Sequence, residues 1–99
     1  MTKMLTPTIH LNGTSKQDLL DQQKEILSAT RDLLQAMRRA TPNGRDYYPQ
    51  GPDASNQARD AFAERYNAVS RIYDEFEELA LQIMLEGLIS ARQDGSNNA

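Results

Sequence analysis

The sequence predicts an all-α fold: an antiparallel two-helix hairpin with a structured Pro- and Gly-rich tip loop, a short extended N-terminal segment, and assembly as a helical-bundle oligomer. Three observations predict it. Apolar residues recur with the period of an α-helix in two long stretches, and a segment rich in proline and glycine separates them. In addition, two helices from a chain of 99 residues bury little apolar surface, so association with further copies is needed for stability.

The first helix is expected over about residues 15–40. Large apolar residues occur there in pairs seven residues apart, which gives the helix one wide apolar stripe: Leu19 with Leu20, Ile26 with Leu27, and Leu33 with Leu34. At its start, Thr14 and Ser15 each precede a polar residue by three positions, as in a capping box. At its end, Pro42 and Gly44 stop the helix.

The other boundaries follow from the same signals. Residues 1–13 form the extended segment, and 14–92 form the hairpin. Between the helices, residues 41–54 contain three prolines and two glycines, which forbid a continuous helix and stiffen the connection. The second helix is expected over about 55–92, and residues 93–99 form a disordered tail.

The second helix is expected to extend beyond the first. At 1.5 Å per residue it spans roughly 55 Å, against roughly 40 Å for the first helix. Its face toward the first helix carries Ala58, Phe62, Val69, Ile72, Phe76, Leu79 and Ile83. Its uncovered end is apolar on more than one side, through Leu81, Ile83, Met84, Leu85, Leu88 and Ile89. One copy cannot hide these side chains, so we expect a homo-oligomer.

Composition excludes several classes of protein. With no cysteine and one histidine, we expect no thiol chemistry, no metal site and no cofactor. No nucleophile and base stand at a recognisable spacing, so we expect no catalytic residue and no enzyme. The net charge of −3 has the wrong sign for general nucleic-acid binding. No apolar run approaches the roughly 18 residues of a membrane span, and the start MTKMLTPTIH lacks the apolar core of a signal peptide, so we expect no membrane partner.

The charges are unevenly distributed along the chain. Between Arg31 and Arg71 there are seven arginines and five acids, a net charge of +2, while the remainder carries −5. All basic residues of the central window are arginine, whose planar guanidinium binds phosphate or carboxylate with two hydrogen bonds. This pattern indicates either an anion site near the tip or ordinary solvated helix faces. The acidic run at residues 74–78 is expected to be a solvated face or the electrostatic partner of another subunit's tip.

The tip loop holds the first group of candidate ligand-binding residues. Two of the four tyrosines, Tyr47 and Tyr48, stand beside Arg45 and Asn43. Aromatic faces stack on a nucleobase and guanidinium groups bind its phosphate, so these residues, with Arg38 and Arg39 at the end of the first helix, fit a nucleotide-like anion. The alternative is structural: one tyrosine closes the end of the bundle, and the polar residues fix the turn.

The second group of candidates precedes the first helix. His10, Asn12, Thr14 and Ser15 surround a helix start, where free backbone N–H groups favour anions. The alternative is a capped helix after a turn. In an antiparallel dimer of hairpins, these residues would lie near the tip loop of the other chain, so that the anion site would be composite.

Two strings in the chain resemble a known group of proteins. His10 to Ser15 (HLNGTS) and Pro42 to Gly51 (PNGRDYYPQG) are similar to segments of small proteins encoded by tailed phages and prophages, and the resemblance spans residues 8 to 90. It implies phage origin and a location in the host cytoplasm, and it carries no activity with it. In architecture alone, the chain is similar to the phage helical-hairpin sponges that sequester cyclic-nucleotide signals (anti-CBASS and anti-Thoeris proteins) and bind ligand between protomers.

These observations lead to one main hypothesis and one alternative. The main hypothesis is a phage-encoded, non-enzymatic binding protein that sequesters a nucleotide-like immune signalling molecule to counter host antiviral defence. The alternative is a protein-protein adaptor or inhibitor that docks on a host enzyme through its helical surface and tip loop. A hydrolase ranks third, because the sequence shows neither a nucleophile with its base nor a metal cluster.

Overall fold

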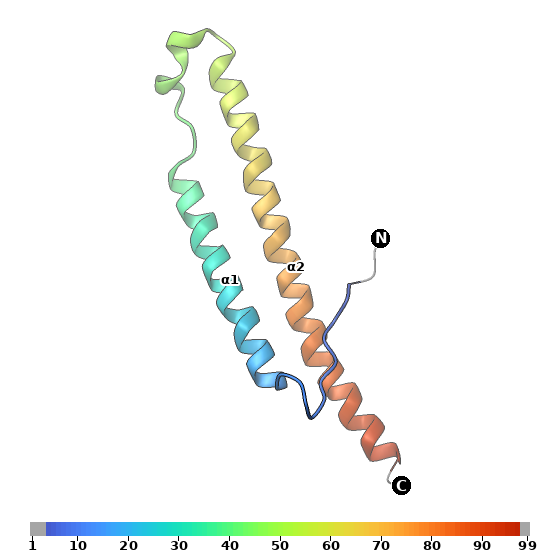
Figure 1. Ribbon diagram of the computed structural model, residues 1–99. Helices are drawn as coiled ribbons and strands as arrows, with labels where there is room; N and C mark the ends of the chain where they lie inside the picture. The colour runs from blue at the N-terminus through green and yellow to red at the C-terminus, as the bar shows by residue number, and fades with distance from the viewer. Residues whose placement is uncertain (1–3, 98–99) are drawn as a thin grey trace. The chain divides into compact units, whose positions relative to one another are not determined.

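The computed structural model describes residues 4–97, with side chains as far as Glu86. The elements are α1 (Lys16–Arg39), the short 3₁₀-helices η1 (Gly44–Asp46) and η2 (Tyr48–Gln50), and α2 (Ala54–Asn97). The described residues contain no strand, and the two α-helices form a hairpin (Figure 1). The predicted all-α hairpin is therefore confirmed, while its assembly into an oligomer stays a prediction.

Side chains next to α1 fix both of its ends. At the start, the Ser15 hydroxyl accepts a hydrogen bond from the backbone N–H of Asp18 at 3.1 Å, which satisfies one of the N–H groups that a helix start leaves unpaired. At the end, the Thr41 hydroxyl donates to the carbonyl of Arg38 at 2.9 Å. Pro42 follows and prevents a further helical turn.

The tip loop is ordered by its own turns. The side chain of Asn43 caps η1 by accepting a hydrogen bond from the backbone N–H of Arg45 at 3.0 Å. Gly44 lies against the start of α2, because a Cβ at this position would be 3.3 Å from the Ser55 hydroxyl oxygen. Gly51 ends η2 at a φ of 121°, a backbone conformation that other residues rarely adopt.

The helix α2 is longer than the sequence predicts. We expected it to end near Arg92 and residues 93–99 to form a disordered tail, but the helix continues to Asn97. No proline follows Arg92, and the one glycine there, Gly95, costs a helix only about 1 kcal/mol, which does not stop it. The expected apolar residues Leu88 and Ile89 lie outside the described side chains. Within the described part of the chain, no helix is long and apolar enough to cross a membrane.

By internal contacts the chain divides into two compact units, which we describe separately. The tip unit comprises residues 29–73, and the terminal unit comprises residues 1–28 together with 74–99. Each unit contains one part of α1 and one part of α2 (Figure 1).

In the tip unit, α1 and α2 meet along a narrow seam of side chains. The seam residues are half-buried and recur at alternating intervals of three and four, as in coiled coils: Thr30, Leu34 and Met37 on α1, and Phe62, Tyr66, Val69 and Tyr73 on α2. Ile72, expected on the inner face, is instead 46% exposed. Tyr73, which is four residues after Val69, occupies the seam position in place of Ile72.

The terminal unit contains the one fully buried apolar side chain among the described residues, Ile83. The N-terminal segment lies along α2 here (Figure 1). The Thr6 hydroxyl donates to Oε1 of Gln82 at 2.6 Å. Its leucines do not cover the helix, because Leu5 and Leu11 are 94% and 98% exposed. The segment therefore attaches through a hydrogen bond, and large apolar groups stay in contact with water.

A polar residue, Gln23, occupies a buried position of α1 in the terminal unit. Its side chain is 8% exposed, and its Oε1 has no hydrogen-bond partner in the described part of the chain. A buried acceptor without a partner costs roughly 1–3 kcal/mol relative to its hydrated state. This position therefore reduces the stability of the hairpin.

Replacing this residue tests that account. We expect Gln23→Leu to raise the free energy of unfolding by about 1 kcal/mol, because an apolar side chain of similar size removes the unpaired acceptor. Urea unfolding followed by circular dichroism at one fixed protein concentration measures the change. Gln22→Leu, next to it and exposed, is the matched control and should change little. A loss of stability in Gln23→Leu alone would show that the amide has a partner in solution.

Candidate anion-binding groove

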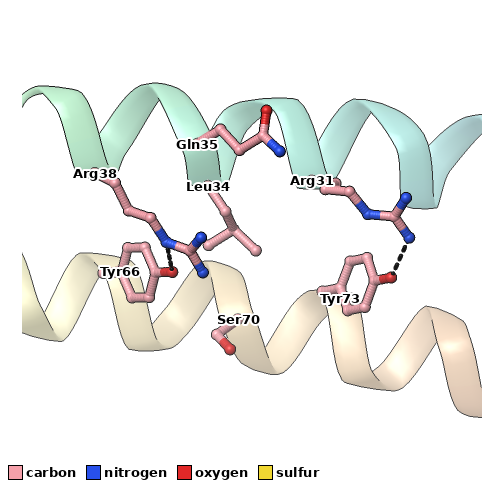
Figure 2. A pocket seen from close by; sticks show the side chains of 7 residues that line it. All are labelled: Arg31, Leu34, Gln35, Arg38, Tyr66, Ser70 and Tyr73. Carbon is pink, nitrogen blue, oxygen red and sulfur yellow. Dashed lines mark hydrogen bonds between the residues drawn. The ribbon is translucent and has the colours of Figure 1, made fainter.

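A groove of about 380 Å³ lies in the tip unit between α1 and α2. Four of its lining residues, Arg31, Leu34, Gln35 and Arg38, come from α1, and three, Tyr66, Ser70 and Tyr73, come from α2. Figure 2 shows both arginine side chains extending from α1 toward the tyrosines of α2. The groove therefore depends on how the two helices pair.

Two arginine–tyrosine pairs form the ends of the groove. Arg31 donates from Nη2 to the hydroxyl of Tyr73 at 2.9 Å, and Arg38 donates from Nε to the hydroxyl of Tyr66 at 2.7 Å (Figure 2). Each guanidinium carbon also lies near the ring of its tyrosine, at 5.9 Å and 5.7 Å from the centroid. These distances are at the outer limit of a cation–π interaction, so the hydrogen bonds are the main contacts.

The repeat of the helices explains why the pairs occur. Arg31 and Arg38 are seven residues apart, and so are Tyr66 and Tyr73, so each pair of like residues lies on one side of its helix. Because the helices are antiparallel, the earlier arginine meets the later tyrosine. The tyrosine rings occupy seam positions and are half-buried, while their hydroxyls reach the arginines at the rim.

Small and apolar side chains line the groove between the two pairs. Leu34 comes from the seam of α1, and Ser70 lies between the tyrosines on α2 (Figure 2). Serine leaves space that a larger side chain would fill, and its hydroxyl both donates and accepts hydrogen bonds. Between the two pairs, the groove therefore offers a ligand both the apolar side chain of Leu34 and the hydroxyl group of Ser70.

The electrostatics of the groove favour an anion. Two of its seven lining residues are arginines and none is acidic. Each guanidinium group carries a positive charge and five N–H donors in a planar arrangement that matches phosphate and carboxylate oxygens. The tyrosine hydroxyls accept from arginine and retain a proton to donate. The arrangement can therefore bind phosphate or carboxylate oxygens beside aromatic rings.

The candidates of the tip loop lie elsewhere in the same unit. Asn43 uses its side-chain oxygen to cap η1, and Arg45 is exposed. Tyr47 is half-buried and Tyr48 is 75% exposed. None of these four residues lines the groove.

Arg38 and Arg39, the two candidates at the end of α1, differ in whether they line the groove. Arg38 lines the groove and bonds to Tyr66, whereas Arg39 is exposed and does not line it. Of the candidate residues that the sequence indicated, Arg38 is thus the member of this groove.

The candidates before α1 belong to the terminal unit. The backbone N–H of Gly13 donates to the carbonyl of His10 at 3.2 Å, and a Cβ at Gly13 would lie 2.6 Å from the His10 ring, so glycine is required for this close approach. Asn12 and Thr14 are exposed, while Ser15 caps α1 with its hydroxyl. The structure thus gives Ser15 a structural contact and shows Asn12 and Thr14 facing solvent.

Four groove residues were not predicted from the sequence: Arg31, Tyr66, Ser70 and Tyr73. The signal that indicates the arginines and tyrosines is their shared spacing of seven residues, on one helix and on the other. Tyr47 and Tyr48 were predicted because they are adjacent in sequence, whereas the tyrosines of the groove are seven residues apart.

Comparison of the chain with protein-family models, curated proteins and solved structures gave no match. Among the described residues, no group of three histidine, cysteine, aspartate or glutamate side chains is arranged to hold a metal ion.

The cap of α1 provides a test of the structural part of this account. Removing the hydroxyl in Ser15→Ala should lower the free energy of unfolding by about 1 kcal/mol, because the N–H of Asp18 loses its acceptor. Thr14→Ala, an adjacent and exposed position, should have little effect. Thermal unfolding followed by circular dichroism compares the two, and equal losses of stability would contradict the assignment of Ser15 as the cap.

Proposed function

We propose that this chain is a non-enzymatic binding protein whose groove holds a nucleotide-like, phosphate-bearing small molecule. The observation that carries the proposal is the pair of arginines positioned by tyrosine hydroxyls around a groove without an acidic lining residue. Positioned guanidinium groups lose less conformational entropy on binding than free ones, so they bind an anion more tightly.

Each part of the ligand has a complementary group in the groove. Arg31 and Arg38 bind phosphate oxygens through charge-assisted hydrogen bonds. The Ser70 hydroxyl bonds to a sugar or phosphate oxygen, and Leu34 contacts the apolar surface of a base. The volume of about 380 Å³ is at the small end of ligand pockets and suits one nucleotide unit at a time.

The tip loop is the second part of the proposed site. Arg45 and Tyr48 are exposed and free to contact a ligand, whereas the side-chain oxygens of Asn43 and Ser15 already bond to the backbone. In the composite arrangement predicted from the sequence, Arg45 and a tyrosine of one copy face His10 to Ser15 of another. That arrangement now depends on Asn12 and Thr14, the exposed members of the helix start.

The biological role we propose is sequestration of an immune signal by a phage protein in the host cytoplasm. The resemblance of the HLNGTS and PNGRDYYPQG strings to proteins of tailed phages supports phage origin. The lining residues of the groove include no histidine, aspartate or glutamate that could activate the Ser70 hydroxyl as a nucleophile, which supports sequestration over turnover. Binding that leaves the ligand unchanged is sufficient for this role.

A second candidate is an adaptor or inhibitor that docks on a host protein. It is favoured by the exposure of Tyr48, which is 75% accessible and stands near Arg45 at the tip of the hairpin. Tyrosine and arginine are the residue types that most often dominate binding energy at protein interfaces. Such a protein would bind its partner through the tip and take up no small ligand.

Titration calorimetry separates the two candidates. The panel contains inorganic phosphate, adenosine, AMP, ADP and a cyclic dinucleotide. The proposal predicts binding of at least one nucleotide, with adenosine much weaker because it lacks the phosphate. An adaptor predicts no heat with any member of the panel, and release of phosphate during the titration would show turnover.

Two neighbouring arginines give a matched pair of variants. Arg38→Gln should weaken nucleotide binding roughly 10- to 100-fold, because a hydrogen bond to a charged group is lost. Arg39→Gln removes the same charge one residue away, outside the groove, and should weaken binding much less. Equal effects of the two variants would contradict the groove as the site, and a larger effect of Arg45→Gln would place the site in the tip loop.

A further inference from the structure

The terminal unit carries one exposed apolar patch on α2. The terminal patch consists of Leu81, Met84 and Leu85, which recur at intervals of three and four residues and thus share one side of the helix. Each is 48–49% exposed. Glu77 and Glu78 lie one turn before Leu81 on the same side, so the patch has an acidic border.

The tip unit carries a second apolar patch, on the side opposite the groove. The tip patch consists of Leu33 and Ile72, which are 49% and 46% exposed. Leu33 and Ile72 directly precede seam residues (Leu34 and Tyr73). Arg38 and Ser70 of the groove directly follow seam residues (Met37 and Val69). In antiparallel helices these two sets lie on opposite sides of the seam. Arg65 lies two turns before Ile72 on the same side, which gives the patch a basic residue at its border.

The two units also differ in net charge. The tip unit contains seven arginines and five acids and carries +2, while the terminal unit contains four basic and nine acidic residues and carries −5. Pairing of terminal units with each other would bring like charges together, which is unfavourable. Pairing of a terminal unit with a tip unit brings opposite charges together.

We propose that the occupant of both patches is another copy of this chain, so that the terminal patch of one copy packs on the tip patch of another. Apolar contact between the patches supplies stability, and the acidic and basic borders select this pairing over like-with-like association. Within the tip unit the tip patch is opposite the groove, so a partner that packs on the tip patch does not cover the groove residues. This inference does not depend on the identity of the ligand.

The first test is the mass in solution. Light scattering after size exclusion should give at least twice 11.2 kDa at micromolar concentration. Leu85→Glu and Leu33→Glu should each weaken the association at least roughly tenfold, because each places a charge in an apolar contact. Leu11→Glu makes the same change at a 98% exposed position outside both patches and should leave the mass unchanged. A wild-type mass of 11.2 kDa overturns the proposal and leaves the patches to another partner.

The second test determines which surfaces meet. The chain has no cysteine, so Ile72→Cys and Met84→Cys each introduce a single thiol. Under mild oxidation, a mixture of the two variants should form disulfide-linked dimers at least roughly tenfold faster than either variant alone, because only unlike units are in contact. Circular dichroism verifies that both variants stay helical. Crosslinking that is as fast within one variant as in the mixture contradicts the pairing of unlike units.

Discussion

The structure depends on one constraint: two α-helices meet along a single seam, and a single seam cannot enclose a core. Of the described apolar side chains, Ile83 alone is fully buried, and the other seam residues keep one side in water. Residues next to the seam therefore lie at the surface, at positions that the pairing of the two helices determines. In the tip unit, Arg31 and Arg38 lie on one side of the seam and Leu33 with Ile72 on the other.

The tyrosines of the seam connect the fold to the proposed site. The rings of Tyr66 and Tyr73 pack between the helices, and their hydroxyls hold Arg38 and Arg31 at the rim of the groove. A tyrosine serves this purpose because its ring is apolar and its tip is polar. The position of each guanidinium thus depends on helix pairing. The tip loop differs, since its turns are stabilised by its own backbone and by Asn43.

The polar and charged residues limit how the hairpin associates. Gln23 lowers the apolar content of α1 at a buried position of the terminal unit, which makes that packing less stable than an all-leucine stripe. The opposite net charges of the two units act differently: they cost little in a single hydrated copy and distinguish between possible pairings of two copies.

The sequence by itself determined the two helices, the start of each, and the ordered loop between them. These features depend on local signals: the helical period of apolar residues, the cap at Ser15, and the prolines and glycines after Thr41. Where local signals are weak, as around Gly95, the predicted end of α2 was wrong. Only the tertiary structure decided which tyrosines meet which arginines, because Arg31 and Tyr73 are 42 residues apart and Arg38 and Tyr66 are 28 apart. Their pairing requires the relative alignment of two antiparallel helices, which a period within either helix does not specify. The period within α2 also does not decide between spacings of three and four residues. Ile72, three residues after Val69, was therefore predicted on the inner face, but Tyr73, four residues after Val69, occupies the seam.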